Sequence, residues 1–97
     1  MRLTFFASGP LEYADEWADA RVSLPIGEAA DMLAFIGLDR ADFGACDAAD
    51  VAARCRRALW PSRHAPTGML PQLRELLALA ERARDGLLVY AAEFESA

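Results

Sequence analysis

Residues 37–50, GLDRADFGACDAAD, contain four aspartates, two glycines and one cysteine within fourteen positions. Glycine in the left-handed conformation commonly ends a helix, and aspartate is among the best residues to begin one. The stretch therefore predicts a boundary between two helices, with one ending at Gly37, a turn, and the next beginning at Asp47. A metal or catalytic site is the competing interpretation, since aspartate and cysteine also serve as ligands and catalytic groups.

The segments on either side have the apolar spacing of amphipathic helices. We expect one helix over residues 25–36 and a second over 47–59, which Trp60-Pro61 ends because a residue before proline avoids helical dihedrals. A third is expected over about 69–84. The inner faces of the three helices are expected to comprise Ile26, Ala29, Ala30, Leu33 and Ile36, then Val51, Ala52, Cys55, Ala58 and Leu59, then Leu70, Leu73, Leu77, Ala80 and Ala83.

Three segments outside these helices have the composition of strands, at residues 2–7, 20–24 and 87–92, and residues 11–20 are compatible with a short additional helix. The predicted fold is α+β, with three main helices packed on one face of a small, mostly antiparallel three-stranded sheet. The chain of 97 residues is expected to form a single domain over residues 1–97.

Charge is unevenly distributed along the chain, whose net charge is −5. Residues 1–50 have ten acidic and three basic residues, whereas residues 51–84 have seven arginines and two acidic residues. This division makes nucleic acid an unlikely partner, although it leaves a local basic patch. No apolar run approaches the roughly 20 residues that span a bilayer, and no signal peptide is recognised, so we expect a cytoplasmic protein with reduced cysteines and no membrane partner.

Metal sites and catalytic motifs fit the sequence poorly. A calcium loop that began at Asp39 would have alanine and phenylalanine at its third and fifth positions, where side-chain oxygens are needed. Cys46, Cys55 and His64 are each nine residues apart, whereas structural zinc sites use close pairs of ligands. The scattered serines and glycines form no nucleophile motif or phosphate loop. We therefore expect no metal, no cofactor and no enzymatic activity.

The acidic segment near the N-terminus is the first candidate binding surface. In a helix, Tyr13 and Trp17 would lie on one face, with Glu16 and Asp19 beside them. Aromatic anchors surrounded by charge are typical of protein interfaces. This pattern predicts a non-enzymatic protein-binding module of the inhibitor, immunity or regulatory type with a basic protein partner. The alternative is that both rings complete the core and the acids face solvent.

A second candidate is an arginine-rich patch at the end of the second helix, formed by Arg54, Arg57, Trp60, Arg63 and His64. Arginine beside an aromatic ring can bind phosphate or a carboxylate-rich partner. This patch predicts a small-ligand or phosphate-handling protein as the alternative function, or it is simply the solvated face of a helix. Association of the acidic half with the basic half of a second copy would instead make a self-associating structural protein, a homo-oligomer.

Three segments carry a family resemblance: residues 29–39 (AADMLAFIGLD), 47–54 (DAADVAAR) and 73–84 (LRELLALAERAR). They resemble a family of small uncharacterised bacterial proteins that run strand, "A..LL..LGL" helix, "DA.DL..R" helix, a helix rich in Leu, Ala and Arg, and a closing strand. The resemblance covers about residues 20–92 and implies no activity and no catalytic residues. Residues 11–20 depart from the pattern as an addition.

Overall fold

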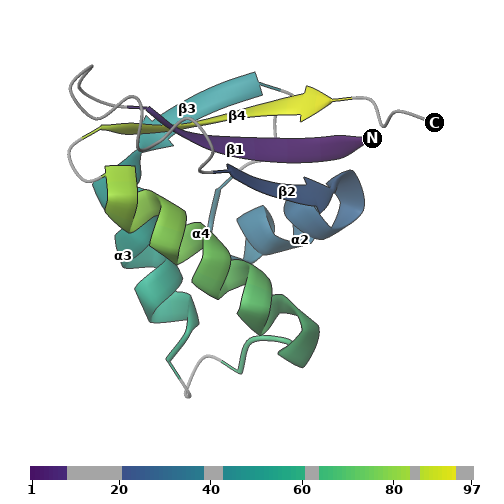
Figure 1. The fold of residues 1–97 in the computed structure, drawn as a ribbon. Coiled ribbons are helices and arrows are strands. Elements are labelled where there is room, and N and C mark those ends of the chain that lie inside the picture. The colour runs from purple at the N-terminus through teal and green to yellow at the C-terminus, as the bar shows by residue number, and fades with distance from the viewer. Residues whose placement is uncertain (9–20, 39–42, 61–63, 84–85, 94–97) are drawn as a thin grey trace.

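The computed structural model describes residues 1–8, 21–38, 43–60, 64–83 and 86–93. It shows an α+β fold (Figure 1). The predicted helix over 11–20 lies outside the described residues. The elements, in chain order, are β1 (Arg2–Ser8), β2 (Arg21–Pro25), α2 (Ile26–Phe35), β3 (Phe43–Asp47), α3 (Ala48–Ala58), the 3-10 turn η3 (Thr67–Met69), α4 (Leu70–Ala83) and β4 (Leu87–Glu93).

The described strands form a four-stranded antiparallel sheet in the order β2-β1-β4-β3. The three predicted strands are confirmed as β1, β2 and β4. The prediction of a three-stranded sheet was wrong, because five of the fourteen residues in the stretch interpreted as a boundary between helices form the strand β3. The helix boundaries on either side of that stretch are confirmed, so only its middle was misassigned.

The sequence of β3 has a low propensity for strands, because Phe43–Asp47 (FGACD) contains no β-branched residue. Its conformation depends on β4 instead. Gly44 lies directly opposite Tyr90, and a side chain at Gly44 would occupy the space that the Tyr90 ring fills. The aromatic ring thus covers the glycine across the strand pair. Tertiary pairing, which is invisible in local sequence, forms this strand.

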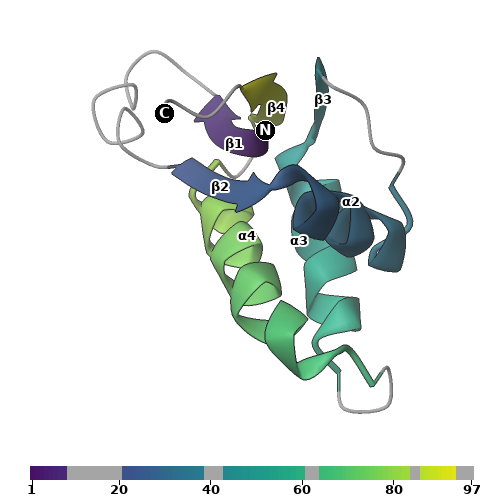
Figure 2. The ribbon, with the colours of Figure 1, turned by 90° about the vertical axis from the view of Figure 1, so that its right-hand side faces the viewer.

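The three helices α2, α3 and α4 lie on the same side of the sheet (Figures 1 and 2). Leu3 and Phe5 in β1 are completely buried, and Leu88 and Tyr90 in β4 are nearly so. These side chains project toward the helices because alternate residues of a strand share a face. The rings of Phe5 and Tyr90 pack 5.7 Å apart. The core therefore fills the space between one sheet face and three helices.

The predicted helix faces are confirmed in part: Ile26, Ala30 and Leu59 are only partly buried, and α4 and α2 each need a further correction. In α4, Leu70 and Leu77 are only partly buried, whereas Leu76 and Leu79 lie in the core. The leucines of α4 spread over about half of its circumference, so periodicity alone does not show which of them face inward. In α2, Met32 is fully buried although the predicted face omitted it.

α2 ends as its sequence predicts. Gly37 has a φ of 80°, the left-handed conformation that favours glycine. The Gly37 N–H donates to the Ala34 carbonyl at 3.1 Å, and the Leu38 N–H donates to the Leu33 carbonyl at 2.8 Å. The second bond is the one that closes a Schellman termination, and Leu38 packs partly buried against the core.

The start of α3 departs from expectation in one detail. Asp47 occupies the N-cap position, but its side chain makes no capping hydrogen bond. Its contribution is therefore that of negative charge near the positive end of the helix, shared with Asp50 in the first turn. Across residues 1–8, 21–38, 43–60, 64–83 and 86–93, no helix combines the length and apolar character needed to cross a membrane.

Gly44→Ala is expected to destabilise the protein by about 1–3 kcal/mol, the usual cost of overpacking a filled site. The new Cβ would lie 2.5 Å from the Tyr90 ring, which has little room to move because it packs against Phe5. Chemical denaturation measures the change. The matched control is Gly27→Ala in α2, where an added Cβ meets nothing within 4 Å and helix propensity predicts a gain of up to about 1 kcal/mol. Equal effects of the two substitutions would contradict the packing described here.

Candidate functional site

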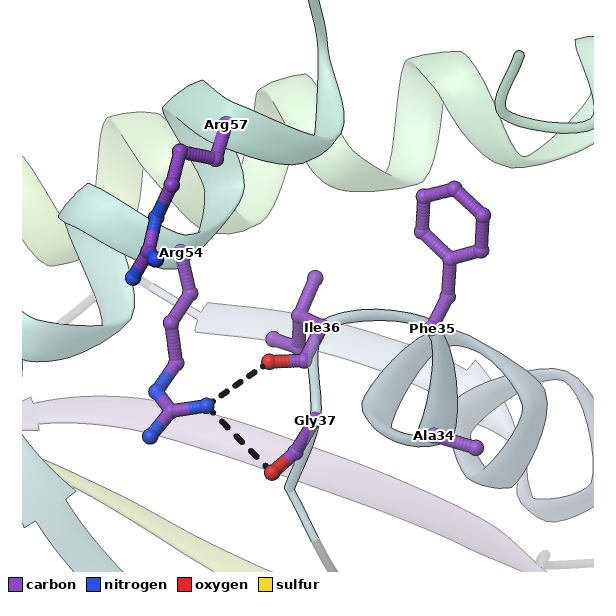
Figure 3. A pocket seen from close by; sticks show the side chains of 6 residues that line it. All are labelled: Ala34, Phe35, Ile36, Gly37, Arg54 and Arg57. Carbon is purple, nitrogen blue, oxygen red and sulfur yellow. Dashed lines mark hydrogen bonds between the residues drawn. The ribbon is translucent and has the colours of Figure 1, made fainter. Parts of the chain in front are cut away.

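A hollow lies between the end of α2 and one side of α3 (Figure 3). Its volume is about 250 Å³, and it is lined by Ala34, Phe35, Ile36, Gly37, Arg54 and Arg57. Pockets that enclose drug-sized ligands usually measure about 300–1,000 Å³, so this one is suited at most to a small group. It contains two of the residues predicted for the arginine-rich patch.

Arg54 reaches across the hollow from α3 to the end of α2 (Figure 3). Its Nη1 donates to the carbonyl of Ile36 at 2.9 Å and to that of Gly37 at 3.3 Å. Its Nε donates to Oδ2 of Asp50, one turn earlier on α3, at 2.9 Å. A cation at the C-terminus of a helix is stabilised by the helix dipole and satisfies its terminal carbonyls. Arg54 thus joins α2 to α3.

Arg57 lines the same hollow one turn further along α3. Its side chain is exposed, and within the described residues its guanidinium makes no hydrogen bond or ion pair. Arg56, its neighbour in sequence, has turned to another side of α3 and donates to Glu81 of α4 at 3.0 Å. Of these three arginines, Arg57 is therefore the one whose guanidinium is not engaged by any of the described residues.

Trp60 and His64 lie beyond the end of α3, in the connection to α4. Trp60 is 65% exposed, the largest exposed fraction among the large hydrophobic residues that the structure describes. The backbone N–H of Trp60 donates to the Arg57 carbonyl at 3.2 Å, which ties Trp60 to the end of α3. His64 is exposed and has a φ of 55°. Arg63 lies outside the described residues.

The arginine-rich patch is therefore divided. Arg54 serves the contact between two helices, while the side chains of Arg57 and Trp60 are both exposed. Anion sites are usually formed by helix N-termini, where N–H groups point outward. This hollow has a helix C-terminus instead, with its carbonyl oxygens, and Asp50 adds negative charge beside Arg54. The carbonyl oxygens make the Arg54 side of the hollow unsuited to an anion, and the phosphate-handling alternative stays a prediction.

The cysteines occupy two different environments. Cys55 is completely buried, and burial raises the pKa of its thiol to about 11, with Arg56 opposing the shift slightly. Cys46 is half-buried in β3, where burial first, then the negative charge of Asp50, raises the pKa of its thiol. Both are thiols in the described structure. In that part of the chain no three His, Cys, Asp or Glu side chains gather in a way that could hold a metal ion.

Of the residues predicted for the acidic-aromatic patch, Tyr13, Glu16, Trp17 and Asp19 all lie outside the described residues. The prediction that they bind a partner stays a prediction. Sequence reasoning missed the carbonyls of Ile36 and Gly37, which accept from Arg54. Backbone acceptors carry no residue signature, and only the i,i+4 spacing of Asp50 and Arg54 hinted at a structural role for this arginine.

No protein-family model, curated protein or solved structure matches this chain. The resemblance to small bacterial proteins drawn from residues 29–39, 47–54 and 73–84 stays a prediction.

Arg54→Ala is expected to lower the free energy of unfolding by about 1–2 kcal/mol, because the terminal carbonyls of α2 lose a charged donor. Arg57→Ala is the matched control on the same helix, and we expect it to change stability by less than about 0.5 kcal/mol. Arg54→Lys keeps the charge without the branched donors and should fall between them. Urea denaturation of the three variants tests this, and equal stability of the two alanine variants would contradict the capping role.

Stability should also depend on alkaline pH through Cys55. The folded thiol has a raised pKa of about 11, so between about pH 9 and 11 the unfolded chain loses a proton that the folded one keeps. The contribution of this group to the free energy of unfolding has its maximum below pH 9. It falls above that, by at most about 1.4 kcal/mol per pH unit. Denaturation of wild type and Cys55→Ala across this range measures the difference in slope. Parallel pH profiles would show that the thiol does not titrate as described.

Proposed function

We propose that the protein is a non-enzymatic protein-binding module. Within the described residues, Trp60 and Arg57 form its proposed binding surface. The observation that supports this proposal is the 65% exposure of Trp60. Removing apolar surface from water is favourable, so a tryptophan held in solvent at a fixed position gains most from a partner that covers it. Tryptophan and arginine are also the residues most enriched at the energetic centres of protein interfaces.

The position of the surface supports the proposal as well. The C-terminal end of α3 and the N-terminal end of α4 lie at the side of the molecule away from the sheet, where a partner can approach without meeting the sheet (Figures 1 and 2). Trp60 directly follows the last turn of α3, so its backbone is anchored by that helix. Such anchoring lowers the entropy lost when a partner orders the side chain.

The chemistry of the surface suggests the partner. Arg57 has no internal ion pair among the described residues, and the segment 51–84 carries a net charge of +5, from seven arginines and two glutamates. A partner that has a carboxylate beside an apolar pocket would form an ion pair with Arg57 and bury Trp60 in that pocket. The acidic-aromatic patch with Tyr13, Glu16, Trp17 and Asp19 is a second proposed surface of the same module, for a basic partner.

The experiment compares partners captured from the native host by the wild type and by two variants, Trp60→Ala and Arg57→Glu. We expect the partner to bind about 30-fold more weakly to Trp60→Ala, which corresponds to the roughly 2 kcal/mol of an interface centre. Arg57→Glu should weaken binding mainly at low salt, because exposed charges are screened at high salt.

Two further variants locate the surface. Arg74→Glu makes the same charge change at an exposed site on α4 and should leave binding unchanged. The double substitution Trp17→Ala/Glu16→Arg tests the acidic-aromatic patch. A partner retained by Trp60→Ala but lost with the double substitution would move the site to residues 13–19, and a partner retained by every variant would reject both surfaces.

A further inference from the structure

The two edges of the sheet differ in how their backbone polar groups are used. At the β3 edge, the Ala48 N–H donates to the Gly86 carbonyl at 3.2 Å, one pair beyond the β3–β4 register. Hydrogen-bonded and non-bonded pairs alternate along an antiparallel ladder, so this bond fixes the phase of the whole strand. Gly44 and Cys46 accordingly direct their backbone groups toward β4, whereas Phe43, Ala45 and Asp47 direct theirs away from the sheet.

The same argument applies at the β2 edge. The Ile26 N–H donates to the Met1 carbonyl at 3.1 Å, one pair beyond the β1–β2 register. The residues of β2 whose backbone groups point away from the sheet are therefore Arg21, Ser23 and Pro25.

The β2 edge is protected in the ways that sheet edges usually are. Pro25 has no amide hydrogen to offer. The outward carbonyl of Ser23 already accepts from Arg2 Nη2 at 2.9 Å, and the same guanidinium donates through Nε to the Ser23 hydroxyl at 3.0 Å. Arg21 adds a charge to this edge, with its guanidinium 5.3 Å from the ring centre of Phe6. Proline, charge and short length are the known means of blocking strand addition.

The β3 edge is as short as β2, at five residues, but it is less protected: Phe43–Asp47 contains no proline, lysine or arginine, and its one charge is that of Asp47 at its end. The outward backbone groups of Ala45 meet no hydrogen-bond partner in the described structure. Ala45 is exposed and its neighbours Gly44 and Cys46 are small, so no bulky side chain stands at the middle of the edge. An extended strand can therefore approach it closely.

We propose that β3 pairs with β3 of a second copy of this chain, antiparallel and centred on Ala45, to form a closed two-fold dimer with one continuous sheet. This interface goes beyond the binding surface at Trp60 and uses a different part of the molecule. The two Ala45 residues would form a hydrogen-bonded pair, with each N–H donating to the other's carbonyl. The Asp47 N–H would donate to the carbonyl of the partner subunit's Phe43.

Charge and symmetry favour a second copy as the occupant. Centring on Ala45 sets each Asp47 opposite an uncharged residue and separates the two carboxylate-bearing residues by about 14 Å, beyond the screening length of about 8 Å at physiological salt. Because the β2 edge is blocked, pairing of the two β3 edges uses up the open edges. The assembly closes at two copies and does not grow into a filament.

Backbone amide exchange followed by NMR, together with sedimentation, tests the dimer in the intact protein. At about 1 mM we expect a dimer in which the Ala45 and Asp47 amides exchange at least about 10-fold more slowly than at about 10 μM. The Gly44 and Cys46 amides point into the sheet, so they should be protected at both concentrations. A monomer at 1 mM, or a dimer whose Ala45 amide exchanges equally fast at both concentrations, would overturn the proposal.

Ala45→Pro removes the central outward donor, and an edge strand tolerates proline where the N–H faces solvent. We expect a monomer at 1 mM in which Gly44 and Cys46 stay protected, which shows that the fold is intact. Ala45→Val keeps the N–H and is the matched control, expected to remain dimeric. Trp60→Ala should also remain dimeric, so failure of the Trp60 surface and failure of this interface are distinguishable. A folded Ala45→Pro dimer would refute the pairing, and so would pairing of β3 with a different protein in place of its own copy.

Discussion

Leu3 and Phe5 are completely buried in β1, a central strand of the sheet, and the rest of the molecule is arranged around the need to cover them. A strand presents alternate side chains to opposite faces, so burying these two residues assigns one face of the whole sheet to the core. α2, α3 and α4 lie on that face (Figure 2). Backbone that could pair with another strand is left only at the two edges of the sheet. The β2 edge is blocked by Pro25 and Arg2, whereas the β3 edge is open, so only the β3 edge can accept a partner strand.

Most of the fold was predictable because its elements have strong local signals. β1, β2 and β4 are apolar or aromatic at the positions that matter, and the helices have caps, breakers and periodic apolar residues. β3 could not be found this way, since glycine, alanine, cysteine and aspartate favour turns or are neutral in strands. It exists because Tyr90 covers Gly44 from the neighbouring strand, a relation between residues 46 positions apart.

The candidate site was predictable only in its residue types. Sequence singled out Arg54 and Arg57 together, but it assigned them one role, and the structure separates them by what each can reach. Arg54 meets carbonyls at the end of another helix, and such acceptors have no signature in the sequence. Trp60 was identified as a member of the patch, yet its exposure depends on how the α3–α4 connection leaves the core. The residues of the acidic segment, among them Tyr13 and Trp17, lie outside the described structure.

The pairing of β1 with β4 has a consequence for the newly made protein. Leu3 faces Ala92 across the middle of the sheet, so the two halves of this pair are made at widely separated times. At about 5–20 residues per second, a ribosome needs roughly 5 to 20 s between releasing them. During that interval β1 can pair on one side with β2, but its other side has unpaired backbone beside Phe5. An unpaired strand edge can pair with other chains, and the speed of translation sets how long this one stays open.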